Sequence, residues 1–258
     1  MDAFGAGLLI GFNVLLGLNQ ALVKLVNAGF SPVFQAGLRS ACAFLPVLLY
    51  ALWARKRLSI TDGTLGPGLM NGLLFSGEFC LLFLALDLTT VSRVSLFFYT
   101  MPLWVAVGAH FLIAGERLSD RKALGLIVAF GGISLALIAG DGSEAGTDNR
   151  WLGDLLALIA SLCWAGIALL ARTTRLAETS PEMNLLYQLA VSAIIVIPLA
   201  FWLGDTVREP TPAILGMFAF QVIVIVAIGF VVWFWILSVY PATNMASFSL
   251  LTPVFGIF

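Results

Sequence analysis

The stretch VSLFFYTMPLWVA, residues 94–106, decides the fold. It lies in an apolar segment, residues 93–114, that is long enough to cross a bilayer and that contains Pro102. Near the end of the sequence, the stretch MASFSLLTPVF, residues 245–255, repeats the pattern with Pro253 at the corresponding position. Proline-interrupted spans at matching positions of two halves are typical of the binding site of a secondary transporter.

The composition predicts a membrane protein. Hydrophobic residues make up 60% of the chain, charged residues make up 10%, and the mean hydropathy is +1.03. Soluble domains carry about 25% charged residues, because their surfaces must face water. We therefore expect an all-α polytopic protein whose surroundings are the lipid bilayer.

Charge and cysteine usage exclude other classes. The net charge is −1 and no basic stripe is present, so we expect no nucleic-acid partner. The three cysteines, Cys42, Cys80 and Cys163, all fall inside apolar segments, which indicates neither a disulfide nor a metal cluster. We expect no cofactor. The first residues lack the positive region of a signal peptide, so the first span is interpreted as a retained helix.

Nine apolar spans can be placed along the chain at about 20 residues each. They cover residues 4–24, 32–53, 67–87, 93–114, 122–140, 152–171, 183–203, 213–239 and a last span from 242. Lysine and arginine are most frequent in the loops after the second, fourth and sixth spans. Because basic loops stay in the cytoplasm, this bias places the N-terminus there.

An internal repeat divides the chain. Lys24 matches Arg172 at an offset of 148 residues, which also pairs Arg39 with Tyr187, and the offset reaches 151 at the two prolines. We expect a first five-helix repeat over residues 1–140, a linker over 141–150 and a second repeat over 151–258. Because five spans is an odd number, the two halves must insert with opposite orientations, as in many secondary transporters.

A resemblance to a known family rests on several of these features. They are FYTMPLW at 98–104, GERLS at 115–119, GGI at 131–133 and the segment from Pro241 to Pro253. With them the chain resembles the drug/metabolite transporter superfamily, EamA type, in both halves. The resemblance implies ten helices in two inverted five-helix repeats that carry small metabolites through a bacterial inner membrane.

The resemblance also predicts features that this sequence does not contain. A second Gly-Glu motif would follow Pro253 by about 14 residues, by analogy with Pro102 and Glu116, and a tenth helix would follow it. We therefore expect the chain to be a fragment of a ten-helix design, without the end of helix nine and without helix ten.

Two charged residues inside the spans are the strongest candidates for function. Glu78 lies midway along the third span, and Arg39 lies about eight residues, or about 12 Å, into the second. The two could meet at one depth and face substrate, with the guanidinium binding a carboxylate or phosphate and the carboxylate binding an amine or proton. In the alternative interpretation, Arg39 reaches toward headgroups and Glu78 is a protonated packing residue.

Other polar and aromatic side chains complete the candidate substrate-binding set. They are Asn13, Gln20, Tyr99, Trp164, Tyr187 and Ser249, with helix kinks at Pro102 and Pro253. For each, the alternative is interhelical hydrogen bonding or core packing. Two glycine pairs, Gly7 with Gly11 and Gly68 with Gly72, are interpreted as sites of close helix packing.

The functional hypothesis is a secondary transporter. The sequence has no HExxH, Gly-x-Ser-x-Gly or phosphate-loop motif, which argues against an enzyme or an ATP-driven pump. We expect export of a small polar or amphipathic metabolite, amino-acid-like or related, by alternating access through a central cavity. Protons are a candidate coupling ion. The alternative is a non-transporting membrane assembly or receptor subunit, and the sequence leaves the oligomeric state open.

Overall fold

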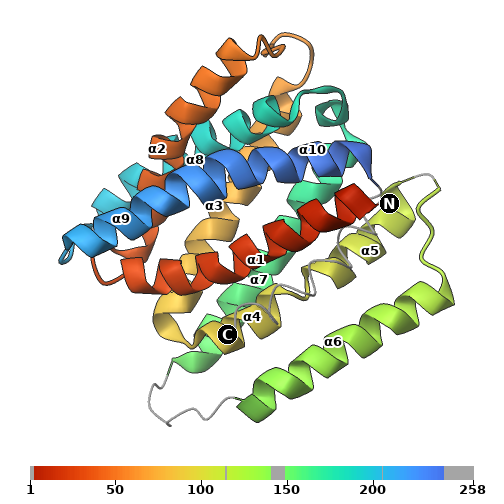
Figure 1. The fold of residues 1–258 in the computed structure, drawn as a ribbon, viewed down its shortest axis with the longest axis horizontal. Coiled ribbons are helices and arrows are strands. Elements are labelled where there is room, and N and C mark those ends of the chain that lie inside the picture. Colours follow the sequence, from red (N-terminus) through yellow and green to blue (C-terminus); the bar gives the residue numbers. More distant parts are fainter. Residues whose placement is uncertain (1–2, 114, 141–148, 205, 241–258) are drawn as a thin grey trace.

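The structure is a computed structural model that describes residues 3–113, 115–140, 149–204 and 206–240. In this part of the chain the regular elements are all helical (Figure 1), and the β pairing is a single isolated bridge between Phe30 and Val207. The elements are α1 Ala3–Val26, α2 Pro32–Trp53, α3 Leu65–Leu88, α4 Val91–Phe98, α5 Met101–Leu112, α6 Asp120–Gly140, α7 Arg150–Thr173, η1 Arg175–Glu178, α8 Pro181–Leu203, α9 Pro212–Phe220, η2 Gln221–Phe230 and α10 Val231–Val239.

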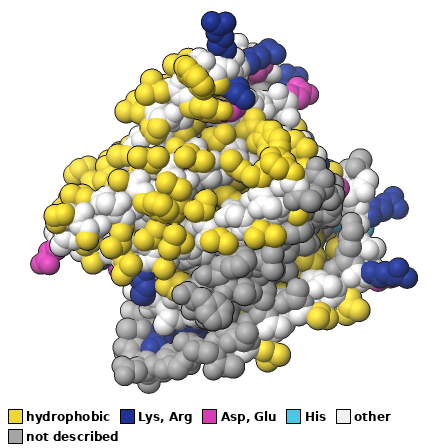
Figure 2. All heavy atoms as spheres, in the orientation of Figure 1, with side chains coloured by type: hydrophobic (Ala, Val, Ile, Leu, Met, Phe, Trp, Pro, Cys, Tyr) yellow, Lys and Arg dark blue, Asp and Glu magenta, His cyan; other side chains and the backbone are white. Residues whose placement is uncertain are grey.

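The expectation of a polytopic helical membrane protein is confirmed. Seven helical segments of the described chain are long and apolar enough to cross a bilayer, and they match the predicted spans one to four and six to eight. Helix α6 occupies the predicted fifth span, whereas the predicted ninth span lies outside the described residues. Figure 2 shows apolar side chains over most of the visible face, with charged groups mainly toward its edges.

The predicted fourth span is two helices and not one. Helix α4 ends at Phe98, and α5 begins at Met101. Pro102 lies in the first turn of α5, where its missing N–H would have no intrahelical partner in any case. At the break, Thr100 donates to the carbonyl of Phe97 through both its N–H, at 3.2 Å, and its hydroxyl, at 2.7 Å. The interruption therefore falls two residues before the proline.

Two helices in different halves begin in the same way. Ser31 caps α2 and Ser180 caps α8, and a proline follows each serine. The Ser31 hydroxyl accepts from the N–H of Phe34 at 3.3 Å, and that of Ser180 accepts from the N–H of Met183 at 3.2 Å. Such caps satisfy a free donor of the first turn. Their spacing of 149 residues falls within the predicted range of repeat offsets.

The helix packing is compatible with the predicted two-fold repeat. Helix α3 packs against α7 and α8, whereas the continuous segment α9–η2–α10 packs against α1 and α2, and α2 packs against α8. We take α7, α8 and α9–η2–α10 as the counterparts of α1, α2 and α3. The contact of α3 with α7 then corresponds to that of α9–η2–α10 with α1, the contact of α3 with α8 corresponds to that of α9–η2–α10 with α2, and the contact of α2 with α8 corresponds to itself. This exchange is the pattern that a two-fold axis produces.

The loops also pair in a reciprocal way at the two ends of the bundle. At one end, the α1–α2 loop meets the α8–α9 loop, where the N–H of Ser31 donates to the carbonyl of Thr206 at 2.8 Å. At the other end, the α2–α3 loop meets the α7–α8 connection, where Arg175 donates to the carbonyl of Asp62 at 2.9 Å. Counterpart loops thus lie at opposite ends, as inverted halves require. We name these the Lys24 end and the Arg172 end.

The glycine pairs behave differently from each other. A Cβ atom at Gly72 would lie 2.5 Å from the Val191 side chain and 2.9 Å from the carbonyl of Tyr187, and one at Gly68 would lie 2.6 Å from the Tyr187 ring. These two glycines let α3 approach α8 closely. At Gly7 and Gly11 a Cβ atom would meet nothing within 4 Å among the described residues, so the predicted close packing is not found in this part of the chain.

We expect Gly72→Ala to lower the free energy of unfolding by about 1–3 kcal/mol, because the added methyl group forces α3 away from the α8 backbone. Gly11→Ala is the matched control, since it adds the same group to an open site. Thermal unfolding of the purified protein in detergent measures the difference. Equal unfolding temperatures for the two variants would contradict the assigned α3–α8 contact.

Candidate functional site

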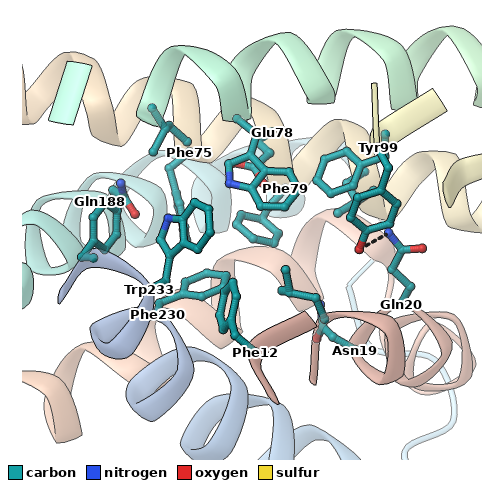
Figure 3. A pocket seen from close by; sticks show the side chains of 16 residues that line it. Phe12, Asn19, Gln20, Phe75, Glu78, Phe79, Tyr99, Gln188, Phe230 and Trp233 are labelled. Carbon is teal, nitrogen blue, oxygen red and sulfur yellow. Dashed lines mark hydrogen bonds between the residues drawn. The ribbon is translucent and has the colours of Figure 1, made fainter. Parts of the chain in front are cut away.

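A cavity lies among helices from both halves of the chain (Figure 3). Its walls come from α1, α3 and the α4–α5 break of the first half, and from α7, α8, η2 and α10 of the second half. Its volume is about 30 Å³. A water molecule needs about 10–15 Å³ on this measure, so the space holds about two waters. It is too small for a metabolite in the conformation that the structure shows.

Aromatic rings form most of the cavity wall. Trp164 stacks on Phe98 with ring centroids 4.9 Å apart, and Phe12 stacks on Trp233 at 5.2 Å. The two tryptophans lie 5.9 Å apart and connect both stacks. Each stack joins a ring of the first half to a ring of the second. Such faces suit apolar groups, aromatic groups or cations. The further aromatic lining residues are Phe75, Phe79, Tyr99, Phe230 and Phe234.

Glu78 is the charged side chain among the lining residues. It is 4% exposed, it comes from the middle of α3, and Figure 3 shows it among the rings. In the described part of the chain its carboxylate forms no ion pair within 4.0 Å and no hydrogen bond. A carboxylate in this position can bind a cation or a proton from the cavity.

Arg39 lies behind the cavity wall and not in it. Its guanidinium carbon is 4.2 Å from the centre of the Phe79 ring and 4.7 Å from that of Phe83, and the residue is 1% exposed. Neither Nη1 nor Nη2 has a hydrogen-bond partner in the described structure. Arg39 and Glu78 attract each other at longer range than a direct ion pair. The ring faces and this attraction offset the burial of the cation.

Gln20 connects α1 to the break between α4 and α5. Its amide donates to the hydroxyl of Tyr99 at 3.4 Å, and its amide oxygen accepts from the hydroxyl of Ser95 at 2.5 Å. Next to the break, the hydroxyls of Thr100 and Ser161 are hydrogen bonded at 2.9 Å, which joins it to α7. The irregular backbone is therefore held by polar contacts from both halves.

Among the polar lining residues, two were missed by the sequence analysis. Asn19 and Gln188 are 3% and 1% exposed, and Asn19 Oδ1 and Gln188 Nε2 have no hydrogen-bond partner in the described part of the chain. Asn19 directly precedes Gln20, and Gln188 directly follows Tyr187, and both of these neighbours were predicted to bind substrate. Asn19 and Gln20 both line the cavity, whereas on α8 a turn of about 100° per residue directs Gln188 to the cavity and Tyr187 away from it. The polar side chains were visible in the sequence, but the rotation of each helix was not.

Besides Arg39, two predicted residues are not part of the cavity wall, and two others lie outside the described residues. Asn13 donates to the carbonyl of Leu9 in its own helix at 2.8 Å. Tyr187 lies at the Arg172 end, where its hydroxyl is hydrogen bonded to Thr64 at 2.9 Å and its ring covers Gly68. Ser249 and Pro253 lie outside the described residues. Gln20, Glu78, Tyr99 and Trp164 line the cavity together.

Comparison with known proteins connects this arrangement to transport. The model of the EamA-like transporter family matches residues 3–138 and again residues 151–258. The uncharacterized transporter YoaV of Bacillus subtilis (strain 168) is 25% identical over 253 residues, which are 97% of this chain and 85% of that protein. A probable amino-acid metabolite efflux pump of Escherichia coli (strain K12) is 26% identical over 255 residues, which cover 95% and 81%.

A solved structure has the same fold. It is described only as the crystal structure of a protein, and it superposes with a TM-score of 0.80. The match covers 99% of this chain and 86% of the other, at 21% sequence identity. At this identity the likeness establishes the fold alone.

Proposed function

Because the chain belongs to the EamA-like transporter family, we propose that it is a secondary transporter that exports a small polar or amphipathic metabolite by alternating access. The membrane is the bacterial inner membrane, with the N-terminus in the cytoplasm, as the distribution of basic loop residues supports. One observation carries the proposal. The cavity between α1, α3, α7 and α10 takes its walls from both halves of the chain and contains one carboxylate among aromatic rings.

The chemistry of the lining supports an amino-acid-like substrate. The stacked rings of Phe98, Trp164, Phe12 and Trp233 offer faces to an apolar side chain or a cation. The carboxylate of Glu78 offers an acceptor for an ammonium group or a proton. Two curated relatives are named probable amino-acid metabolite efflux pumps, which agrees with this chemistry.

The small size of the cavity supports alternating access as the mechanism. With a volume of about 30 Å³, the cavity has no room for an amino acid in this conformation. Substrate must therefore enter after helices separate at one end of the bundle and leave after they separate at the other. Inverted halves make these two openings nearly equivalent, because the same movement can occur in either half.

Counterflow in proteoliposomes tests the proposed function. Vesicles loaded with each of the twenty amino acids in turn are diluted into a trace of the same labelled amino acid, and uptake is followed over time. We expect saturable, trans-stimulated uptake for one or more of them, and protein-free vesicles are the control. Uptake that never exceeds the control, together with unchanged export of metabolites from expressing cells, would contradict transport and favour an assembly or receptor role.

Adjacent residues on α8 provide a paired test of the cavity. We expect Gln188→Leu to reduce flux by about tenfold, because it removes a buried amide from the wall. Tyr187→Phe removes a hydroxyl at the Arg172 end and should leave the KM for substrate unchanged. Initial rates in proteoliposomes measure both. A larger loss of flux in Tyr187→Phe than in Gln188→Leu would place the site elsewhere.

A further inference from the structure

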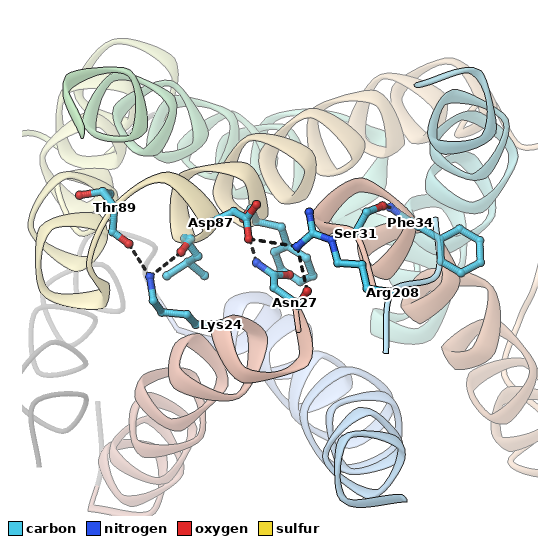
Figure 4. A network of polar contacts seen from close by, with 9 residues as sticks. Lys24, Asn27, Ser31, Phe34, Asp87, Thr89 and Arg208 are labelled. Atoms are coloured by element: carbon cyan, nitrogen blue, oxygen red, sulfur yellow. Dashed lines mark hydrogen bonds and ion pairs between the residues drawn. The ribbon is translucent and has the colours of Figure 1, made fainter. Parts of the chain in front are cut away.

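A cationic side chain binds the end of helix α3 at the Lys24 end (Figure 4). Lys24, two residues before the end of α1, donates from Nζ to the carbonyl of Leu86 at 2.8 Å and to that of Thr89 at 2.6 Å. Leu86 belongs to the last turn of α3, and Thr89 is its C-cap. These carbonyls have no partner within their own helix, so an ammonium group both satisfies them and complements the helix dipole.

The same arrangement occurs at the opposite end of the bundle. Arg172, one residue before the end of α7, donates from Nη1 to the carbonyl of Leu237 at 2.8 Å and to that of Tyr240 at 3.1 Å. Leu237 belongs to the last turn of α10, and Tyr240 is its C-cap. The other guanidinium nitrogen, Nη2, donates to Glu116 at 3.1 Å.

The two arrangements correspond residue by residue. Leu237 and Tyr240 follow Leu86 and Thr89 at the same offset of 151 residues, which is also the offset between the two prolines. Both C-caps have extended backbone, and their N–H groups donate at 2.9 Å to the carbonyls of Ala85 and Ile236, which are again 151 residues apart. One structural device is therefore present twice, at opposite ends of the molecule.

Each cation crosses a boundary between two packed units. Helices α3 and α4 pack closely against α7, and α1 packs mainly against α9, η2 and α10, with fewer contacts between α1 and α3 and between α7 and α10. The cavity lies between these two units and takes lining residues from both. Lys24 joins α1 to α3 at one end, and Arg172 joins α7 to α10 at the other. Separating the units at either end must break the contact at that end and can leave the other intact.

We propose that Lys24 and Arg172 are a pair of alternating latches, each of which holds the cavity closed at its own end. Both latches are formed in this structure, in agreement with a cavity of about 30 Å³. Opening at the Lys24 end releases the carbonyls of Leu86 and Thr89 to water, and opening at the Arg172 end releases those of Leu237 and Tyr240. The proposal rests on alternating access in the proposed function and identifies the positioning residues that control it.

Side-specific labelling of the cavity tests the latches. A cysteine replaces Leu16, a lining residue, in a chain whose three native cysteines are changed to alanine. A membrane-impermeant maleimide is applied to vesicles of each orientation. We expect Lys24→Met to raise the labelling rate about tenfold from the Lys24 end alone, and Arg172→Met to do so from the Arg172 end alone. Opposite effects of two similar substitutions would not follow from a general loss of stability.

Two other basic residues provide matched controls. Arg93 pairs with Asp154 at the Lys24 end, but it joins α4 to α7 within one unit. Lys56 pairs with Glu182 of α8 at 3.1 Å at the Arg172 end, and it does not join α7 to α10. Arg93→Met and Lys56→Met should leave the labelling rates from both sides close to those of the parent.

Conservative variants separate the latch from the fold. Lys24→Arg and Arg172→Lys keep a cation at each helix end and should restore the labelling of the parent. The proposal would be overturned if Lys24→Met and Arg172→Met left the labelling rates unchanged, or if both raised the rate from the same side. It would also be overturned if Lys24→Arg and Arg172→Lys did not restore the labelling rates of the parent. Labelling needs no substrate, so side-specific opening without saturable flux in the parent would contradict the proposed function and support the latches.

Discussion

Glu78→Gln is expected to abolish saturable flux and to lower the free energy of unfolding by about 3 kcal/mol. The amide keeps the shape of the side chain but removes the charge that attracts the buried guanidinium of Arg39. Arg39 is 1% exposed, its Nη atoms have no hydrogen-bond partner in the described structure, and arginine cannot lose its proton. The variant therefore leaves an uncompensated cation inside the protein.

Thermal unfolding in detergent and counterflow in proteoliposomes measure the two effects. Asp154→Asn is the matched control, because it makes the same chemical change to a carboxylate that pairs with Arg93. The Arg93 side chain is 36% exposed, so it stays hydrated after its partner is neutralised, and we expect only a small loss of stability. Wild-type stability and flux in Glu78→Gln would show that Glu78 serves neither the fold nor transport.

Arg39→Met in the Glu78→Gln background is expected to recover most of the lost stability without recovering flux. Methionine occupies a similar volume between the Phe79 and Phe83 rings and carries no charge, and buried charges can often be replaced by apolar groups without loss. The double variant then folds with an uncharged cavity wall. If Glu78 binds the substrate ammonium group or a coupling proton, flux stays absent although the protein is intact.

The single variant Arg39→Met completes this comparison. Its stability should stay within about 1 kcal/mol of the parent, because a carboxylate without its partner can take up a proton, whereas a guanidinium cannot release one. Full flux in the double variant would assign Glu78 a structural role. A destabilisation by Arg39→Met as large as that by Glu78→Gln would contradict the asymmetry between the two residues.

Several features of this protein could be predicted because they depend on local properties of the chain. Apolar runs of about 20 residues predict membrane spans directly, since every backbone polar group in lipid must be satisfied within its own helix. The seven long apolar segments agree with this rule. Pro102 indicated an interruption of the fourth span. The interruption lies at Tyr99 and Thr100, where Thr100 forms hydrogen bonds with Phe97 and Ser161.

The same local reasoning could not determine which face of each helix meets the cavity. Glu78 was found because a charge inside a span has few alternatives, but Tyr187 was selected where its neighbour Gln188 lines the wall. Gly68 and Gly72 contact α8, whereas a Cβ atom at Gly7 or Gly11 would meet no described residue within 4 Å. The residue types alone do not indicate which of Tyr187 and Gln188 lines the cavity, or which of the two glycine pairs packs against another helix.

The sequence by itself therefore determined the class of protein, the bounds of most spans and the buried charge. Only the tertiary structure decided the rotation of each helix and, with it, the cavity wall and the contacts of Lys24 and Arg172. The physical reason lies in the bilayer. Lipid tails are as apolar as a helix interface, so the pattern of apolar residues does not indicate which side of a helix is buried. Rotation is set by the packing of small residues and by hydrogen bonds between helices, which form only when the whole bundle is assembled.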